Sequence, residues 1–272
     1  MRVLLTNDDG IGAEGLHALR RALGDVEEID THVIVPDSNR SATARSITTR
    51  SPLSVEEVEL DDGFIAYATD GTPVDCVRFA DLGLVGDRPD LIVSGINHGS
   101  NLGDDITYSG TVAAALEGIV LGIPAIAISQ QGNAQEMGFL PGRGFDFAVA
   151  AGIGAELVRL LAEAPLPAET LLNVNVPAGE PEGIEVTGLG KRLYNDELRL
   201  VGEDGDGRRR YQIYGFEPSF EDEPGTDLVA VARGLISITP VHFDLTDRDG
   251  LTRLREWDLD RMFREVLAGV TP

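Results

Sequence analysis

Residues 2–10 read RVLLTNDDG, a short apolar run followed at once by polar side chains and a glycine. An apolar run of this length that ends in turn-forming residues is typical of a buried strand. Residues 13–23 then place Leu16, Leu19 and Leu23 on one face of a helix. The stretch therefore predicts the first strand and helix of a βαβ unit, with two carboxylates at the carboxyl end of the strand.

The same alternation of apolar runs and helical stretches continues along the chain. Residues 53–60 and 64–68, joined by Asp61-Asp62-Gly63, are typical of a hairpin. Further strands are predicted at residues 32–35, 90–96, 125–129, 171–176 and 236–239, and further helices at residues 74–82, 111–121, 145–164 and 252–267. This pattern predicts an α/β fold with a mostly parallel sheet.

The periodicity changes between residues 184 and 222. Residues 198–201 and 211–214 flank the turn-rich stretch GEDGDG at residues 202–207, which predicts a long hairpin. A two-stranded ribbon is marginally stable alone, so we expect this arm to pack on another subunit or on the main body. No linker separates the parts, and residues 1–272 are predicted to form a single domain with an arm at about 184–222.

The charge balance narrows the classes of function. The chain has 22 Lys and Arg residues against 46 Asp and Glu residues, a net charge of −24. Such a surface repels nucleic acid backbones and anionic lipids, so neither nucleic acid nor a membrane is expected as a partner. The only lysine is Lys191, which excludes a P-loop. The acid excess predicts a protein that works in concentrated salt, with compositional drift as the alternative.

The chain shows no segment for export or membrane insertion. No apolar run approaches the roughly 20 residues that span a bilayer, and Met1 leads directly into the first predicted strand. We therefore expect a cytoplasmic protein. A single cysteine, Cys76, excludes an intrachain disulfide and a multi-cysteine metal site.

Polar loops follow three of the predicted strands. Asp8 and Asp9 follow the first, residues 36–41 follow the second, and residues 97–105 follow the strand at 90–96. Because the carboxyl ends of parallel strands form one edge of a sheet, we expect these loops to meet. Neighbouring carboxylates repel each other unless a cation, a proton or an arginine compensates them. The oxygen-rich loops favour Mg²⁺ or Mn²⁺, whereas the alternative is that Asp8 or Asp9 only caps the following helix.

Ser109-Gly110-Thr111 stands at the start of the helix predicted for residues 111–121. Free N–H groups, two hydroxyls and a glycine at a helix start favour binding of an anion such as phosphate. The alternative interpretation is an ordinary N-cap, because serine and threonine are common at that position. Beside an acid-bound metal ion, the phosphate interpretation is favoured.

Residues 10–15, GIGAEG, match the dinucleotide-binding pattern G-x-G-x-x-G after a strand, and Asp37 follows at the end of the second strand. A pyrophosphate there would lie beside Asp8, Asp9 and Glu14, and like charges so close repel one another. An NAD-binding oxidoreductase is therefore kept only as the alternative.

Several motifs occur together along the chain, at residues 4–10, 36–41, 71–76, 94–97 with 108–115, 172–177, and 224–227 with 237–240. Together they resemble the SurE family of survival-protein nucleotidases. The resemblance runs nearly end to end, dense up to about Pro124 and sparse between Gln130 and Thr170. The Asn-Asp-Asp-Gly start at residues 7–10, combined with the loop from Asn97 to Thr111, is far more specific than a glycine motif alone.

The resemblance implies a Rossmann-like three-layer sandwich with an extended β-hairpin arm. It implies a metal-dependent phosphatase, a 5′-nucleotidase that hydrolyses nucleoside 5′-monophosphates, with 3′-nucleotides or polyphosphate as further substrates. It also implies one Mg²⁺ or Mn²⁺ ion per subunit and a homodimer or homotetramer built partly by exchanged arms. A non-catalytic nucleotide sensor is the second alternative.

The resemblance also implies roles for particular residues. Asp8, Asp9, Ser41 and Asn97 are the implied metal ligands, and one of the two aspartates would accept the proton of the attacking water. The residues implied around the phosphate are Asn101, Ser109, Gly110 and Thr111.

Two positions depart from the family pattern. Glu14 stands where proline is common, and His98 stands where a small residue is common. Neither is expected to touch the proposed ligands, although His98 lies at the edge of the predicted substrate pocket. The arm around residues 196–222 matches the family poorly.

Overall fold

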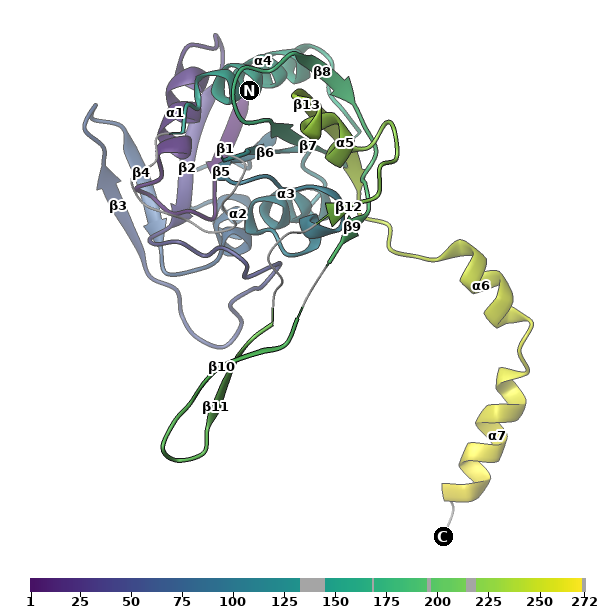
Figure 1. Cartoon of the computed structure of the whole chain (residues 1–272). Coiled ribbons are helices and arrows are strands. Elements are labelled where there is room, and N and C mark those ends of the chain that lie inside the picture. Colours follow the sequence, from purple (N-terminus) through teal and green to yellow (C-terminus); the bar gives the residue numbers. More distant parts are fainter. Residues whose placement is uncertain (133–144, 168, 195–196, 214–218, 271–272) are drawn as a thin grey trace. The chain divides into compact units, whose positions relative to one another are not determined.

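The structure is a computed structural model of the chain (Figure 1). It describes residues 1–132, 145–167, 169–194, 197–213 and 219–270. The chain divides into two compact units, residues 1–242 and residues 243–272. That residues 1–272 form one domain stays a prediction.

Within the described residues, nine strands of the first unit form one sheet in the order β3-β4-β2-β1-β5-β6-β7-β13-β8. Neighbouring strands are parallel except for the pairs β3/β4 and β7/β13. The mostly parallel sheet predicted from the sequence is confirmed. The strands are β1 (Arg2–Thr6), β2 (Asp30–Pro36), β3 (Val55–Glu59), β4 (Ile65–Thr69), β5 (Leu91–His98), β6 (Ala125–Gln130), β7 (Thr170–Val176), β8 (Gly183–Val186) and β13 (Leu235–His242).

Helices cover both faces of this sheet (Figure 1). On one face, α1 (Glu14–Gly24) and α4 (Ala148–Glu163) bury Leu16 and Val158 among the side chains of β1, β5 and β6. On the other face, α2 (Pro73–Asp81) and α3 (Gly110–Val120) bury Val77 and Val112. Because both faces are covered, the central strands are continuous apolar runs, as parallel sheets require. The three-layer α/β sandwich is confirmed.

Strand β1 marks the point where the chain reverses its direction across the sheet. Leu4 of β1 pairs with His32 of β2 on one side and with Ile92 of β5 on the other. In open α/β sheets, ligands bind at the carboxyl ends of the strands at such a switch point. The loops that follow β1 and β5 therefore meet where a binding site is expected.

Two predicted helices differ from the structure by more than one residue. Helix α4 begins at Ala148 rather than at residue 145; its N-cap is Phe147, and the Asp146 carboxylate before it accepts a 3.0 Å hydrogen bond from the Ala148 amide. The helix predicted at residues 252–267 is wrong. The second unit has two helices, α6 (Arg248–Arg255) and α7 (Leu259–Val270), because the Asp258 carboxylate accepts from the Arg261 amide and starts a new helix.

The predicted hairpin is present as β10 (Arg199–Glu203) and β11 (Arg209–Gln212), which pair antiparallel. Tyr214, predicted to end its second strand, lies outside the described residues. The beginning of the predicted arm is different, because β8 is a strand of the main sheet. Short strands β9 (Arg192–Leu193) and β12 (Ser219–Phe220) also pair antiparallel. Arg192 forms an ion pair of 2.8 Å with Asp105 in the 3₁₀ helix η1 (Gly103–Thr107).

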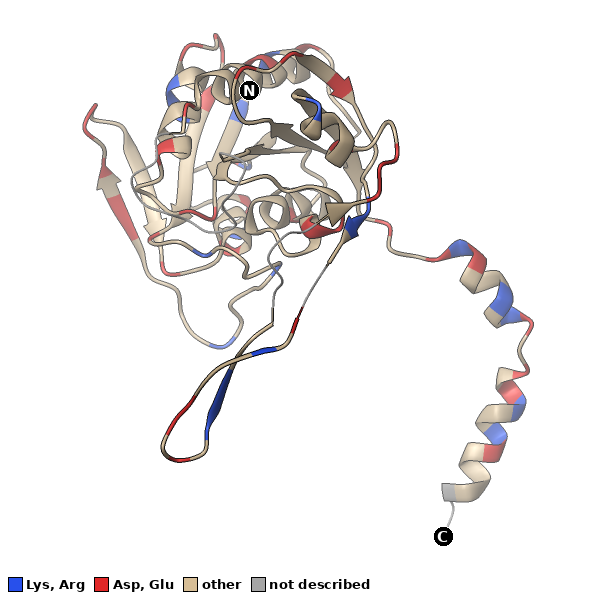
Figure 2. Cartoon of the chain, viewed as in Figure 1, with Lys and Arg blue, Asp and Glu red and all other residues tan. Residues whose placement is uncertain are grey.

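Acidic residues are distributed over many strands, helices and loops of the first unit (Figure 2). The edge strand β3 carries the exposed side chains of Glu56, Glu57 and Glu59. Charges on an edge strand oppose pairing with another sheet. None of the helices in the described part of the chain is both long and apolar enough to cross a membrane.

Candidate active site at the ends of β1 and β5

Asp8, directly after β1, is a buried carboxylate with 3% of its surface exposed. Its Oδ1 accepts a 2.5 Å hydrogen bond from the hydroxyl of Thr111 in α3. Burial, and then the neighbouring charge of Asp9, raise the pKa of Asp8 to about 6, while the Thr111 hydrogen bond acts in the opposite direction. The ionised form of Asp8 is therefore only partly compensated by the protein.

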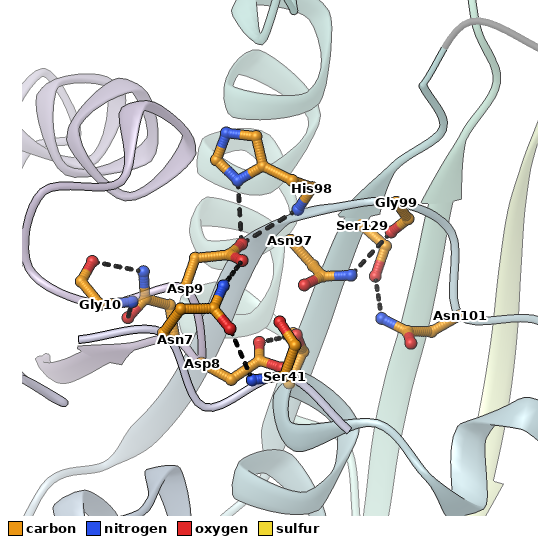
Figure 3. A network of polar contacts seen from close by, with 12 residues as sticks. Asn7, Asp8, Asp9, Gly10, Ser41, Asn97, His98, Gly99, Asn101 and Ser129 are labelled. Carbon is orange, nitrogen blue, oxygen red and sulfur yellow. Dashed lines mark hydrogen bonds and ion pairs between the residues drawn. The ribbon is translucent and has the colours of Figure 1, made fainter. Parts of the chain in front are cut away.

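Asp9 is held through both carboxylate oxygens (Figure 3). Oδ1 accepts a 3.0 Å hydrogen bond from the Asn39 side chain. Oδ2 contacts the His98 backbone amide at 3.1 Å and the His98 ring Nδ1 at 2.9 Å. The expectation that His98 touches no proposed ligand is therefore wrong, because the end of β5 brings its ring onto the loop after β1.

The alternative that Asp8 or Asp9 caps the first helix is also wrong. The N-cap of α1 is Ala13, and no side chain caps it. The loop after β1 instead turns toward the loop after β2, where the Arg40 amide donates to the Asp8 carbonyl at 2.7 Å. Both carboxylates are thus kept at the carboxyl edge of the sheet.

The two neutral residues expected as ligands are Ser41, in the loop after β2, and Asn97, the last residue but one of β5. Asn97 Nδ2 donates to the Gly99 carbonyl at 2.8 Å, so its Oδ1 is directed to the side of Asp8 and Asp9 (Figure 3). The Ser41 amide donates to Asn39 Oδ1 at 2.9 Å, and Asn39 in turn donates to Asp9. Asn39, which the sequence did not single out, therefore links Ser41 to Asp9.

The start of α3 binds the Asp8 carboxylate. Ser109 is the N-cap and accepts a 3.1 Å hydrogen bond from the Val112 amide, so the capping interpretation of this serine is confirmed. A Cβ at Gly110 would lie 2.7 Å from both Cβ and Oδ2 of Asp8. The expected anion site at the amino end of this helix thus faces a carboxylate of the protein itself.

Asn101 is held by a buried amide network that the sequence analysis missed. Its carbonyl accepts from the side chains of Asn173 and Asn175 at 2.9 Å each, and its amide donates to Asn175 Oδ1 at 2.8 Å. Its own side chain donates to Ser129 at 2.7 Å. The available signal was the pair of asparagines at alternate positions of an otherwise apolar strand, since a buried amide without a partner is costly.

The donor set fits a hard divalent cation. In the described part of the chain, no cluster of three or more His, Cys, Asp or Glu side chains is placed to hold a metal ion. The site therefore combines two carboxylates with neutral serine and asparagine oxygens, a set that suits Mg²⁺ or Mn²⁺. A cation beside Asp8 and Asp9 would offset the charge repulsion that raises the pKa of Asp8.

Two of the three glycines of the dinucleotide-like motif are explained by backbone packing, whereas a Cβ at Gly12 would meet nothing within 4 Å. Gly10 has a φ of +95°, and a Cβ there would lie 3.0 Å from the Ser38 backbone. A Cβ at Gly15 would lie 2.2 Å from the Ile96 carbonyl oxygen. These two glycines are required by the fold without any bound nucleotide.

Comparison with known proteins shows the family to which the chain belongs. The family model described as survival protein SurE matches residues 3–196, more than half of the chain and the part that carries the site. The chain belongs to the SurE family. The 5′-nucleotidase SurE of Rubrobacter xylanophilus is 52% identical over 266 residues, which cover 96% of this chain and 99% of that protein. The 5′-nucleotidase SurE of Geobacter metallireducens is 45% identical, with the same shares covered.

A solved SurE structure has the same fold. The crystal structure of the SurE protein from Aquifex aeolicus matches with a TM-score of 0.73 and 38% identity, over 94% of this chain and 100% of that one. The resemblance to the SurE family that the motifs indicated is confirmed.

Proposed function

We propose that this SurE-family chain is a metal-dependent phosphatase that hydrolyses nucleoside 5′-monophosphates to nucleoside and phosphate. The observation that carries the proposal is that Asp8, Asp9 and Asn97 come together at the carboxyl ends of β1 and β5, with the start of α3 hydrogen-bonded to Asp8. Relatives named 5′-nucleotidase SurE, at 45% to 52% identity over nearly the whole chain, support this reaction class.

In this proposal Asp8, Asp9, Ser41 and Asn97 hold one Mg²⁺ or Mn²⁺ ion per subunit. When bound, such an ion neutralises charge on the phosphoryl oxygens and lowers the pKa of a bound water. The protein orients three of these side chains beforehand: Thr111 holds Asp8, Asn39 and His98 hold Asp9, and the Gly99 carbonyl holds the Asn97 amide.

The remaining residues bind the phosphate and move a proton. The Ser109 hydroxyl accepts from the Val112 amide, which leaves its own proton to donate to a phosphate oxygen. Asn101 is fixed by Asn173, Asn175 and Ser129, so its side chain is presented in one orientation. Gly110 and Thr111 keep the start of α3 against Asp8, and Asp8 or Asp9 accepts the proton of the attacking water.

The test is phosphate release from a panel of nucleotides. The panel contains the four 5′-monophosphates, 3′-AMP and polyphosphate, each with Mg²⁺ or Mn²⁺ and with excess EDTA. We expect release from 5′-monophosphates that EDTA abolishes and added metal restores. Asp8→Asn and Asp9→Asn should each lower turnover by at least on the order of 10²-fold. Asp30→Asn, which removes an exposed carboxylate at the first residue of β2, is the matched control.

Each alternative predicts a different result of the same experiment. Turnover that persists in EDTA would remove the metal from the proposal. Nucleotide binding without phosphate release would indicate a sensor. Binding of NADH without phosphate release would indicate the oxidoreductase.

The proposal includes a homodimer or homotetramer of a cytoplasmic protein. The hairpin exposes Leu200 and Tyr211, and the second unit exposes Trp257 and Phe263. Apolar side chains gathered on small elements with little core favour burial against another copy. Light scattering during size-exclusion chromatography tests the oligomer, and a monomer at micromolar concentration would contradict it.

A further inference from the structure

The ring of His98 is directed onto one oxygen of Asp9. Nδ1 lies 2.9 Å from Asp9 Oδ2, and the His98 backbone amide donates to the same oxygen at 3.1 Å. An ionised carboxylate only accepts hydrogen bonds, so Nδ1 carries the proton in this contact. Asn39 binds the other oxygen, Oδ1. The plane of the Asp9 carboxylate is thus defined from both sides.

Two phenylalanines fix the plane of the His98 ring. Phe147 meets it edge to face, with ring centroids 4.9 Å apart and planes at 82°. Phe145 also meets the His98 ring edge to face, with ring centroids 5.1 Å apart and planes at 89°. The two phenylalanine rings stack on each other. The His98 side chain is 9% exposed and that of Asp9 is 4% exposed. The imidazole therefore has little freedom to turn its Nδ1 away from Asp9.

We propose that His98 is a positioning residue that orients Asp9 to bind the divalent cation. This inference rests on the proposed function, since it takes Asp9 as a cation ligand. A carboxylate that rotates freely must be ordered each time it binds an ion, whereas one held at both oxygens is already oriented. Side chains that orient a ligating carboxylate typically contribute about 10-fold to 100-fold to metal affinity.

Two variants of the full chain separate the hydrogen bond of His98 from its packing. His98→Phe keeps an aromatic ring against Phe145 and Phe147 but removes the Nδ1 donor. His98→Asn keeps a side-chain N–H at a similar distance from the backbone but removes the ring. His32→Ala is the matched control, because it breaks a histidine–aspartate contact of 3.0 Å with Asp30 away from the site.

The first measurement is Mn²⁺ binding to the metal-free protein, followed by electron paramagnetic resonance of the free ion. We expect His98→Phe to weaken Mn²⁺ binding by about 10-fold to 100-fold and His98→Asn to weaken it less. We expect His32→Ala to bind as the wild type does. At saturating Mn²⁺, His98→Phe should lower kcat for AMP while KM changes by less than about 3-fold.

The relative Mn²⁺ affinities of His98→Phe and His98→Asn decide whether the inference holds. Equal Mn²⁺ affinities for both variants, or weaker binding by His98→Asn than by His98→Phe, would show that the ring serves packing and would overturn it. Thermal melting of the metal-free variants checks that they fold. If His98→Phe does not fold, His98→Leu takes its place with the same expectation.

Failure of the proposed function gives a different result. If the wild type does not bind Mn²⁺, or if Asp9→Asn binds it as the wild type does, the metal site itself is wrong. If the wild type binds Mn²⁺ through Asp9 and both His98 variants match it, the metal site stands and only the role of His98 falls.

Discussion

The carboxylate of Asp8 lies at the amino end of α3, where the Thr111 hydroxyl donates a 2.5 Å hydrogen bond to its Oδ1. The first turn of a helix carries partial positive charge, so this position stabilises an anion. The partial charge at the start of α3 and the Thr111 hydroxyl therefore offset part of the free-energy cost of burying the Asp8 carboxylate, a role that an arginine or lysine often has in other proteins. That arrangement leaves Asp8 available to a cation.

Removal of the Thr111 hydroxyl should be costly. Thr111→Val keeps the shape of the side chain but leaves the buried Asp8 oxygen without this donor. Hydrogen bonds to charged groups contribute about 1.5–3 kcal/mol, so we expect the free energy of unfolding to fall by that amount, together with lower turnover. Urea denaturation measures the first effect. Thr107→Val, which removes an exposed hydroxyl bonded to the Asp104 carbonyl, is the control and should change little.

Asp8→Asn should stabilise the metal-free protein at neutral pH. The pKa of Asp8 is raised from 3.8 to about 6 by burial and by Asp9, so folding takes up a proton between those values. The stability that this carboxyl contributes is present below about pH 4 and is lost as the pH rises through about 6. An asparagine has no charge to bury.

The gain of Asp8→Asn over the wild type should therefore grow by up to roughly 3 kcal/mol between about pH 4 and pH 7, at 1.36 kcal/mol per pKa unit. Denaturation of both proteins in EDTA at both pH values measures this difference in the free energy of unfolding. A difference of the same size at the two pH values would contradict the raised pKa of the buried Asp8 carboxyl. Added Mn²⁺ should stabilise the wild type and not this variant.

Gly110→Ala should displace Asp8. The added methyl group would lie 2.7 Å from the Asp8 side chain, so the carboxylate or the helix start must move. A shift of about 1 Å in a catalytic group costs on the order of 10²-fold in rate, and we expect a loss of that size in phosphate release. Gly152→Ala on α4 is the control, because a Cβ there meets nothing within 4 Å. It should keep full activity and gain up to about 1 kcal/mol of stability.

Cys76 should be unreactive in the native protein. It lies on the buried face of α2 and is fully buried, and burial raises the pKa of its thiol far above the usual range. Reaction with a disulfide reagent at about pH 8 should be negligible in buffer and should reach one thiol per chain in guanidinium chloride. Rapid labelling of the native protein would mean that the core opens around α2.

The stability of the protein should rise with salt. The net charge is −24, and glutamates stand exposed even along the edge strand β3 (Figure 2). Self-repulsion of these charges is screened within about 3 Å at 1 M salt and within about 10 Å at 0.1 M. We expect the Tm to increase between about 0.1 M and 2 M KCl. A Tm and activity that do not change in dilute buffer would favour compositional drift.

The mostly parallel character of the sheet was predictable because each central strand is an apolar run closed by polar residues and alternates with helices. The meeting of Asp8 and Asp9 with the loop after β5 followed from the same pattern, since parallel strands share one edge. The break between α6 and α7 was less visible, because Trp257 and its neighbours continue the helical composition. The interruption rests on local hydrogen bonds, such as those from the Trp257 amide to the Leu254 carbonyl and from the Arg261 amide to the Asp258 carboxylate.

The partners of the site residues were harder to predict. His98 and Asp9 are 89 positions apart in the sequence. The two phenylalanines that contact the His98 ring, Phe145 and Phe147, follow β6 in the chain. Asn175 binds Asn101 across a separation of 74. Such contacts depend on the order of strands in the sheet, which the alternation of helices and strands does not determine.

Strand β13 lies between β7 and β8, although it follows both of them in the chain. A truncated protein ending near residue 196 would contain all four implied cation ligands but would lack β13. In the full chain, Thr239 and Ser237 of β13 pair with Asn173 and Asn175 of β7. Without β13, this edge of β7 would be unpaired, and β8 would have no neighbouring strand in the sheet. Ribosomal synthesis must therefore reach residues 235–242 before the sheet that carries the candidate site can close, and fragments shorter than that should be recovered as aggregates.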